Sequence, residues 1–471
     1  MSRKRAPLSP RWNTPMTDPL WRAEDAAAAT GGRLTGGPWV ANGVSIDTRE
    51  IRADDLFVAL KDQRDGHEFV ASAFGNGASA ALVERGSGAG PELVVDDTLQ
   101  ALRDLGAAAR ERSDARRVAV TGSVGKTSVK EALAAVFEKA GRAHASARSF
   151  NNHWGAPLTL ARMPADTQRA VFELGMNHAG ELTDLSGLVK PHIAAITRIG
   201  EAHIGFFKSL EAIADAKAEI FSGLEADGVA VINADDPQSG RLRAAAGGRR
   251  IVTFGRAADA DARILDYRSG DTGGEGEIAV FGETVKFQIP IPGAHWAENA
   301  ACVFACAAMA EIDAQTAAAA LLAFQAPAGR GGVIQASADG KPFTLIDDSY
   351  NANPVSMRAA LAALGGRQPE GEGRRIAVLG EMLELGDDAA GYHARLAGPI
   401  AAAGVDLVFV SGELMGALWD ALPASARGGR YASGGEVSDA LRGAIRPGDV
   451  VLVKGSNASG MSRVAAALKG G

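Results

Sequence analysis

A short apolar run that leads into a glycine-rich loop constrains the fold of this chain most. Residues 117–120, Arg-Val-Ala-Val, read as a buried strand, and the loop Thr121-Gly122-Ser123-Val124-Gly125-Lys126-Thr127-Ser128 follows directly. A helix is predicted next, over 128–140. Glycines allow backbone N–H groups to surround a phosphate, and the start of a helix adds a positive dipole. The order strand, loop, helix therefore predicts a phosphate-binding loop on an α/β sheet.

Two side chains of this loop suit nucleotide chemistry. Lys126 can reach the β- and γ-phosphates, and the hydroxyl of Thr127 can bind Mg²⁺. The loop is the short form G-x-x-G-K-T, since Val120 stands where the usual first glycine would be. The alternative is a glycine turn that merely precedes a lysine, which the strand and helix on either side disfavour. The predicted nucleotide-binding residues are Gly122, Ser123, Val124, Gly125, Lys126, Thr127 and Ser128.

Strand-like apolar runs alternate with helical stretches along most of the chain, which is typical of parallel sheets with crossover helices. The runs in the first third are 44–46, 55–60, 80–84 and 93–95, with helices predicted from Pro19 to Ala29, capped by Thr17, and over 99–112. In the middle they are 117–120, 170–173, 193–197, 229–233 and 251–254, followed by a hairpin over 277–289 and a helix over 298–309. In the last third they are 343–347, 376–380, 407–411 and 450–454.

The length of 471 residues corresponds to about three domains, and two linker-like stretches divide the chain accordingly. One lies at 113–115, and the other, rich in glycine and proline, at 325–332. The predicted organisation is a disordered extension over 1–16, a first domain over 17–114, a central domain over 115–329 and a last domain over 330–471.

Composition excludes several classes of protein. Forty-nine basic against 56 acidic residues give a net charge of −7, which argues against a nucleic-acid binder. Only two cysteines occur, Cys302 and Cys306, and they read as small apolar residues of one helix face. The apolar run 300–310 is too short to span a bilayer, and 1–16 lacks the apolar core of a secretory signal. We expect a cytoplasmic protein without membrane insertion.

Polar residues near strand ends are further candidates. Glu173 ends a predicted strand, where a Mg²⁺ ligand would lie beside a phosphate loop. The amide of Asn299 could hydrogen-bond an adenine, and Arg330 at a glycine-rich junction suits a phosphate. Taken alone, His203 is more often structural than a ligand, and Lys217 on a helix reads as a surface lysine.

Together these segments resemble the Mur ligases, the ATP-dependent amide-forming enzymes of peptidoglycan precursor synthesis. The likeness runs from about residue 43 to 465, and the segments that carry it are 121–128, 151–158, 173–176, 202–204, 216–220 and 233–237. The last-third segments 347–354, 378–382 and 453–457 are similar to those of the family members that add D-alanyl-D-alanine, and 45–49 and 65–67 fit the UDP-substrate domain. One departure is Arg198, where relatives often carry Asn, and it is given no role.

The resemblance implies three α/β domains: a small N-terminal UDP-substrate domain, a central P-loop parallel-sheet ATPase domain and a C-terminal Rossmann-like domain. It implies that ATP activates the terminal carboxylate of UDP-N-acetylmuramoyl-tripeptide as an acyl phosphate, which D-alanyl-D-alanine then attacks. ATP and Mg²⁺ would be the cofactors, and a monomer without nucleic acid is expected. Whether the third residue of the tripeptide is diaminopimelate or lysine stays open.

The resemblance also assigns roles by position. It implies metal ligation by Thr127, Glu173, His203 and a carbamylated Lys217. Catalytic roles fall to Lys126, Lys217, His203 and Arg330, and nucleotide contacts beyond the loop fall to Asn299, Arg330 and Asp347. The implied UDP-substrate residues are Ser45, Asp47, Thr48, Arg49, Asn151 and Asn152. Those implied on the D-alanyl-D-alanine side are Asp348, Ser349, Tyr350, Asn351 and Asn353.

Two alternatives remain at this level. Another amide ligase of the same superfamily, such as folylpolyglutamate synthase, shares the phosphate loop and the lysine, but the segments 45–49 and 347–354 disfavour it. A phosphate-loop nucleotide switch without ligase chemistry would leave Glu173, His203, Lys217 and the last domain unexplained.

Overall fold

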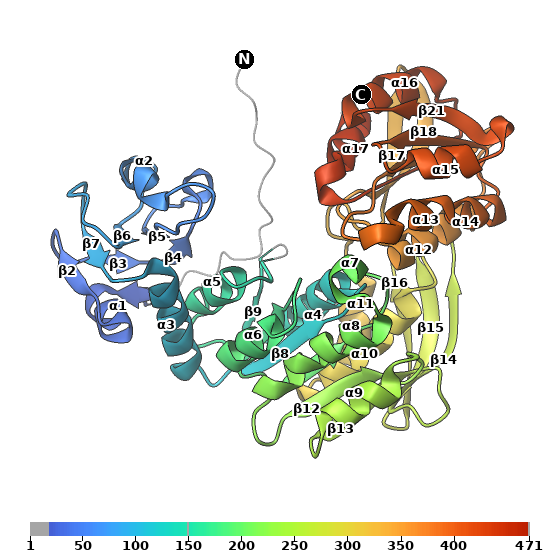
Figure 1. Cartoon of the computed structure of the whole chain (residues 1–471). Coiled ribbons are helices and arrows are strands. Elements are labelled where there is room, and N and C mark those ends of the chain that lie inside the picture. The colour runs from blue at the N-terminus through green and yellow to red at the C-terminus, as the bar shows by residue number, and fades with distance from the viewer. Residues whose placement is uncertain (1–17, 148–149, 470–471) are drawn as a thin grey trace. The chain divides into compact units, whose positions relative to one another are not determined.

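The computed structural model describes residues 18–147 and 150–469, and its elements are labelled in Figure 1. The chain divides into two compact units. One comprises Met1–Asp114 and Pro157–Thr167, and the other comprises Ala115–Ala156 and Gln168–Gly471. The extension predicted over 1–16 and the capping residue Thr17 lie outside the described residues. Within the described residues no helix is long and apolar enough to cross a membrane.

The first unit is built on a five-stranded sheet in the order β2-β7-β6-β5-β4, parallel except for the β2–β7 pair. Its strands are β1 (Trp21–Arg22), β2 (Arg33–Thr35), β3 (Val40–Ala41), β4 (Gly43–Ser45), β5 (Asp55–Val58), β6 (Ala80–Val83) and β7 (Glu92–Val94). Its helices are α1 (Ala23–Thr30), α2 (Val70–Gly75) and α3 (Thr98–Glu111), and α5 (Gly155–Ala161) runs into it from the second unit. The four strands predicted in this unit are confirmed.

The predicted start of the first helix at Pro19 is wrong. Trp21 and Arg22 instead form β1, which pairs antiparallel with β3, and the indole N–H of Trp21 donates to the carbonyl of Ala161 at 2.8 Å. Helix α1 therefore begins only at Ala23. The extended pairing satisfies backbone groups that a helix would otherwise have to satisfy internally.

The second unit contains a nine-stranded sheet in the order β16-β15-β14-β13-β12-β11-β8-β10-β9. The strands from β9 to β14 are parallel, and β14, β15 and β16 form an antiparallel end. Their bounds are β8 (Arg116–Thr121), β9 (Ala143–Ala145), β10 (Arg169–Glu173), β11 (Ile193–Ile196), β12 (Val229–Asn233), β13 (Arg250–Gly255), β14 (Ala262–Ser269), β15 (Gly274–Val280) and β16 (Glu283–Ile289). The predicted parallel strands and the hairpin are confirmed, whereas β14 was not predicted.

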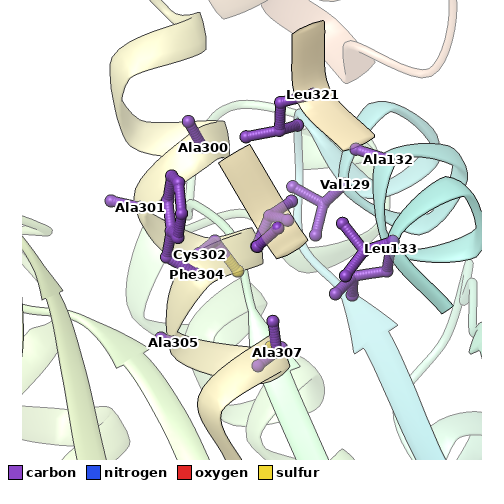
Figure 2. Packing of buried hydrophobic residues seen from close by; sticks show 14 of the residues in the cluster. Val129, Ala132, Leu133, Ala300, Ala301, Cys302, Phe304, Ala305, Ala307 and Leu321 are labelled. Atoms are coloured by element: carbon purple, nitrogen blue, oxygen red, sulfur yellow. The ribbon is translucent and has the colours of Figure 1, made fainter. Parts of the chain in front are cut away.

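Helices cover this sheet and bury its apolar side chains. They are α4 (Lys126–Ala140), α6 (Glu181–Val189), α7 (Ile204–Phe207), α8 (Leu210–Ala218), α9 (Ser239–Ala246), α10 (Trp296–Met309) and α11 (Ala314–Leu322). Figure 2 shows Cys302 and Phe304 of α10 packed among Val129 and Leu133 of α4 and Leu321 of α11. Both cysteines are free and buried, as expected for apolar residues of a helix.

A second sheet of the same unit has six strands in the order β17-β18-β22-β19-β20-β21, parallel except for β17. Its strands are β17 (Gly332–Ala338), β18 (Lys341–Asp348), β19 (Arg375–Gly380), β20 (Leu407–Ser411), β21 (Arg427–Tyr431) and β22 (Val450–Lys454). Its helices are α12 (Pro354–Gly365), α13 (Ala389–Ala394), α14 (Ala397–Ala402), α15 (Gly416–Ala421), α16 (Gly434–Ala444) and α17 (Met461–Lys469). The four strands predicted here are confirmed, and β22 lies between β18 and β19.

Candidate active site

The glycine loop joins β8 to α4 and owes its path to two glycines. Gly122 has a φ of 151°, and an added Cβ would lie 2.0 Å from Oγ1 of Thr197. Gly125 has a φ of 87°, and its Cβ would lie 2.7 Å from Oδ1 of Asn299. The Thr197 hydroxyl donates to the carbonyl of Val124 at 2.5 Å. The loop is therefore shaped by positions that only glycine fills without strain.

Lys126 begins α4, and its ammonium folds back over the loop. Nζ donates to the carbonyl of Gly122 at 2.6 Å. Burial lowers the pKa of Lys126, the carboxylate of Glu173 opposes that shift, and the nearby Arg330 adds to it. The lysine thus lies among the charged groups that a phosphate chain would meet.

Glu173 ends β10 directly beside the loop strand, since β10 and β8 pair in parallel with Glu173 opposite Val120. The side chain is 1% exposed. Oε1 accepts a hydrogen bond from Nδ2 of Asn151 at 2.8 Å, whereas Oε2 is buried without a hydrogen-bond partner among the described residues. A buried carboxylate oxygen without a donor is costly unless a cation or another donor meets it.

Lys217 occupies the penultimate position of α8 and is buried, with 1% of it exposed. The surface position that the local pattern predicts when taken alone is therefore wrong. Burial lowers the pKa of Lys217 well below its usual value, and the charge of Lys126 lowers it further. In the part of the chain that the structure describes, Nζ of Lys217 has no hydrogen bond or ion pair. A buried amine that is driven toward its neutral form is nucleophilic.

His203 precedes α7 with a φ of 60° and is held from the six-stranded domain. Its Nδ1 lies 2.5 Å from Oε2 of Glu384, and the carbonyl of Glu384 accepts from the backbone N–H of Gly205 at 3.0 Å. The hydrogen bond to His203 is the main reason that the pKa of Glu384 is lowered. This bond occupies Nδ1 and orients the imidazole, so Nε2 is the ring nitrogen that remains for a ligand.

The turn between β18 and α12 contributes the other face of the site. The Arg330 guanidinium lies over the Tyr350 ring, 4.3 Å from its centroid. Asn353 caps α12 by accepting from the backbone N–H of Ser356 at 2.9 Å, and its Nδ2 donates to the carbonyl of Ser123 at 3.3 Å. The phosphate loop and this turn are thus in direct contact.

These groups surround one cavity of about 660 Å³, which is large enough for a nucleotide. The predicted residues that line it are Ser123, Val124, Gly125, Lys126, Thr127, Ser128, Asn151, Glu173, His203, Asn299, Arg330, Asp348, Tyr350, Asn351 and Asn353. The predicted residues of the second unit that do not line it are Gly122, Asn152, Lys217, Asp347 and Ser349. Gly122 belongs to the loop but does not line the cavity. Oδ1 of Asn152 accepts from the N–H of Gly155 at 2.9 Å.

Asp347 lies beside a different cavity, which the linker around 323–332 lines. Its Oδ2 lies 2.6 Å from Nζ of Lys469, and its Oδ1 accepts from Oγ of Ser349 at 2.5 Å. Asp347 thus does not line the cavity of the phosphate loop, and its nucleotide contact stays a prediction.

The predicted UDP-substrate residues of the first unit lie together at the end of β4. Oγ of Ser45 donates to the carbonyl of Asp47 at 3.1 Å, and both carboxylate oxygens of Asp47 accept from the exposed Arg49 side chain. Thr48 begins a short 3-10 helix, Thr48–Glu50, with Asp47 as its N-cap. An exposed, preorganised arginine of this kind suits a phosphate or carboxylate ligand.

Several residues at the cavity escaped sequence reasoning. Arg198, given no role above, makes two 2.8 Å hydrogen bonds to the carboxylate of Glu298, a residue 100 positions away. Lys454 is 2% exposed and binds Asp348 at 2.7 Å. Arg367 is 7% exposed, and its Nε has no hydrogen-bond partner among the described residues. Lys454 lies in the segment 453–457 noted above, but no local pattern indicates the contacts that these side chains make, because their partners are distant in sequence.

A cation fits the residues at one end of the cavity. Over 18–147 and 150–469 no group of three or more His, Cys, Asp or Glu side chains is placed to hold a metal ion. Glu173, whose Oε2 is unpartnered among the described residues, nevertheless lines the same cavity as Thr127 and Lys126. Hard oxygen donors and phosphate oxygens are the ligands that Mg²⁺ prefers, so the donor set suits Mg²⁺ bound together with a nucleotide.

The parallel sheet with its glycine loop makes the chain a phosphate-loop nucleotide-binding protein of the α/β class. The Mur ligase middle domain matches residues 120–307, and the Mur ligase glutamate ligase domain matches residues 329–457. The chain is 38% identical over 380 residues to UDP-N-acetylmuramoyl-tripeptide--D-alanyl-D-alanine ligase of Bacillus subtilis, covering 80% of this chain and 81% of that protein. The chain therefore belongs to the Mur ligase family.

Solved structures agree with this assignment. MurF from Acinetobacter baumannii superposes with a TM-score of 0.84 at 30% identity, covering 96% of this chain and 99% of that one. MurF ligase from Thermotoga maritima, solved in complex with ADP, has a TM-score of 0.75 at 24% identity, covering 91% and 97%, and shows the shared fold. The three-domain α/β fold and the ATP-dependent amide-ligase class predicted from sequence are confirmed.

Proposed function

We propose that this chain joins D-alanyl-D-alanine to the terminal carboxylate of UDP-N-acetylmuramoyl-tripeptide at the expense of ATP. The family assignment supports the ligase chemistry, and the Bacillus subtilis relative carries this activity in its name. The single structural observation that carries the proposal is the shared cavity. In it the phosphate loop, Glu173 and the turn Asp348–Asn353 all face one space.

The reaction needs two steps. The tripeptide carboxylate attacks the γ-phosphorus of ATP, which gives an acyl phosphate and ADP. The free amine of D-alanyl-D-alanine then attacks the acyl carbon, phosphate leaves with the bonding pair, and the amine loses a proton. Two unit negative charges 4 Å apart repel by about 4 kcal/mol at an effective dielectric constant of about 20. Phosphoryl transfer among such anions depends on positioning and charge neutralisation.

The residues of the cavity meet this requirement. Lys126 and Arg330 supply positive charge near the phosphates, and the stacking of Arg330 on Tyr350 fixes the guanidinium. Thr127, Glu173 and His203 would hold Mg²⁺, which when bound supplies further charge neutralisation. Lys217 would join them as a carbamate, since a neutral buried amine reacts with CO₂ and thereby gains oxygen donors.

Further assignments are part of the same proposal. Ser45, Asp47, Thr48 and Arg49 of the first unit would bind the UDP-linked substrate. Asn151 and Asn152 are assigned to the same substrate from the resemblance alone. Asn299 would contact the nucleotide, and Asp348, Tyr350, Asn351 and Asn353 would face D-alanyl-D-alanine. Ser349, which does not line the cavity and donates to Asp347, would support this side of the site. Residues 17–114, 115–329 and 330–471 would act as the three functional domains. We place the monomeric enzyme in the cytoplasm, where ATP and nucleotide-linked sugars are made.

One assay tests the proposal. Phosphate release from ATP is measured with UDP-N-acetylmuramoyl-tripeptide, with and without D-alanyl-D-alanine. We expect turnover only with both substrates, and none in Lys126→Ala. Phosphate release that is independent of both substrates would instead favour a nucleotide switch. Turnover of Lys126→Ala at the rate of the unchanged chain would refute the role of the phosphate loop.

A further inference from the structure

Lys454 is a buried cation that the proposed mechanism does not use. It ends β22, and the parallel pairing of β22 with β18 sets it directly opposite Asp348. Paired residues of neighbouring strands point to the same face of the sheet, so the two side chains meet. Only 2% of Lys454 is exposed.

Every donor of this ammonium is directed at one turn. Nζ lies 2.7 Å from Oδ2 of Asp348, 2.8 Å from the carbonyl oxygen of Asn351 and 3.5 Å from the carbonyl oxygen of Asp348. An ammonium has three donors and no acceptor. Lys454 is therefore saturated by the turn that follows β18, which leaves no donor for a substrate.

The turn that Lys454 holds is the one that meets the phosphate loop. In this turn the Tyr350 ring stacks against the Arg330 guanidinium, and the Tyr350 N–H donates to the carbonyl of Gly329 at 3.1 Å. Its Asn353 caps α12 and donates to the carbonyl of Ser123. A continuous set of contacts thus runs from the carboxyl end of β22, through the turn 348–353, to the phosphate loop and Arg330.

We infer that Lys454 is a positioning residue for the nucleotide, which acts through the turn 348–353 on Arg330 and on the phosphate loop. The inference rests on the proposed function, because it assumes that ATP occupies the cavity. Loss of the ammonium leaves the Asp348 carboxylate and the Asn351 carbonyl without their shared donor. The turn then loses its fixed position. Arg330 and the phosphate loop, which the turn contacts, are then no longer held in place for the nucleotide.

The strands β19 and β22 of the same sheet offer a matched control. At their amino ends Arg374 precedes β19 and Asp449 precedes β22, and Nη2 of Arg374 lies 2.8 Å from Oδ2 of the buried Asp449. This ion pair belongs to the same sheet but does not line the cavity. Arg374→Met thus removes a buried ion pair from the same domain without touching the turn.

The test compares Lys454→Met with Arg374→Met in the full chain. The measurements are thermal unfolding, the KM values for ATP and for the other two substrates, and the Kd for ADP by equilibrium titration. We expect both variants to unfold at lower temperature. Only Lys454→Met should weaken ADP binding tenfold or more and raise the KM for ATP, with the KM for UDP-N-acetylmuramoyl-tripeptide changed least. Lys454→Arg, which keeps charge and donors, should recover part of the loss.

An equal effect of both variants on ADP binding would reduce Lys454 to a structural role and overturn the inference. Should Lys454→Met not fold, Asp348→Asn removes the partner charge and preserves shape, and the same comparison of ADP binding decides. Failure of the unchanged chain to bind ADP would instead contradict the proposed function, so the two failures are distinguishable.

Discussion

Replacing Gly122 by Ala tests whether the phosphate loop is as tightly built as its backbone indicates. The φ of 151° is one that side chains rarely adopt, and the added Cβ would lie 2.0 Å from Oγ1 of Thr197 and 3.2 Å from the backbone N of Arg198. Left-handed backbone costs about 1–2 kcal/mol for a residue with a Cβ, and overpacking a tight site costs about 1–3 kcal/mol. The expected loss of stability is therefore about 2–5 kcal/mol.

Thermal unfolding and phosphate release measure the two consequences separately. For a domain of about 200 residues, about 3 kcal/mol lowers the melting temperature by roughly 6–12 °C. The contact cannot be relieved without moving Thr197, whose hydroxyl holds the carbonyl of Val124. A displacement of the loop by about 1 Å costs about 100-fold in rate, so activity should fall by that factor at a temperature where the variant is folded.

Gly240→Ala is the matched control. Gly240 lies in α9 of the same unit, and no atom lies within 4 Å of the position its Cβ would take. Alanine in a helix is favoured over glycine by about 0.8–1 kcal/mol, so this variant should be slightly stabilised and fully active. If Gly122→Ala kept both the melting temperature and the activity of the unchanged chain, the argument from the loop geometry would be wrong.

Three further predictions concern charges. Glu173→Gln keeps the oxygen that accepts from Asn151 but places an amide NH₂ where the unpartnered Oε2 lies. The Mg²⁺ concentration for half-maximal activity should therefore rise about tenfold or more. An unchanged Mg²⁺ requirement would exclude Glu173 as a ligand. Lys217→Ala should lose activity and regain part of it with acetate or formate, and an absence of rescue would count against the carbamate. Burial lowers the pKa of His393, whose Nε2 accepts from the N–H of Met382, so below pH 6.5 the unfolded chain binds the proton more readily. Stability should therefore fall as the pH drops below 6.5, and His393→Asn should flatten that slope. A slope unchanged in urea titrations would contradict this.

Local sequence patterns were enough to predict the parts of the site that one segment builds by itself. The phosphate loop and the placement of Glu173 at a strand end follow from glycines, an apolar run and the geometry of parallel strands. The sheets follow from the alternation of apolar strands with helices. Strand β21, Arg-Gly-Gly-Arg-Tyr, escaped because its composition is polar and glycine-rich, and β14 escaped because its second half, Asp-Tyr-Arg-Ser, is polar.

Partners that are distant in the chain could not be predicted from such patterns. The surface position expected for Lys217 failed because α8 lies against other elements that bury it. No sequence pattern near Asp347 indicates that its partner is Lys469, which lies 122 positions later in the chain. Glu384, 181 positions from His203, likewise shows no local signal. Burial and pairing of this kind depend on how the sheets are assembled, which only the tertiary structure shows.

The place of β22 in its sheet has a consequence for biosynthesis. β22 is the last strand of the described residues, yet it lies between β18 and β19, which are translated about 100 and 70 residues earlier. Until it arrives, both neighbours have edges with unpaired backbone groups, which are prone to wrong pairing. The ion pairs of Lys454 and Asp449 mark the two ends of β22. A slip of two residues as β22 enters would break both pairs, so they select the correct register at the moment when the nascent sheet closes.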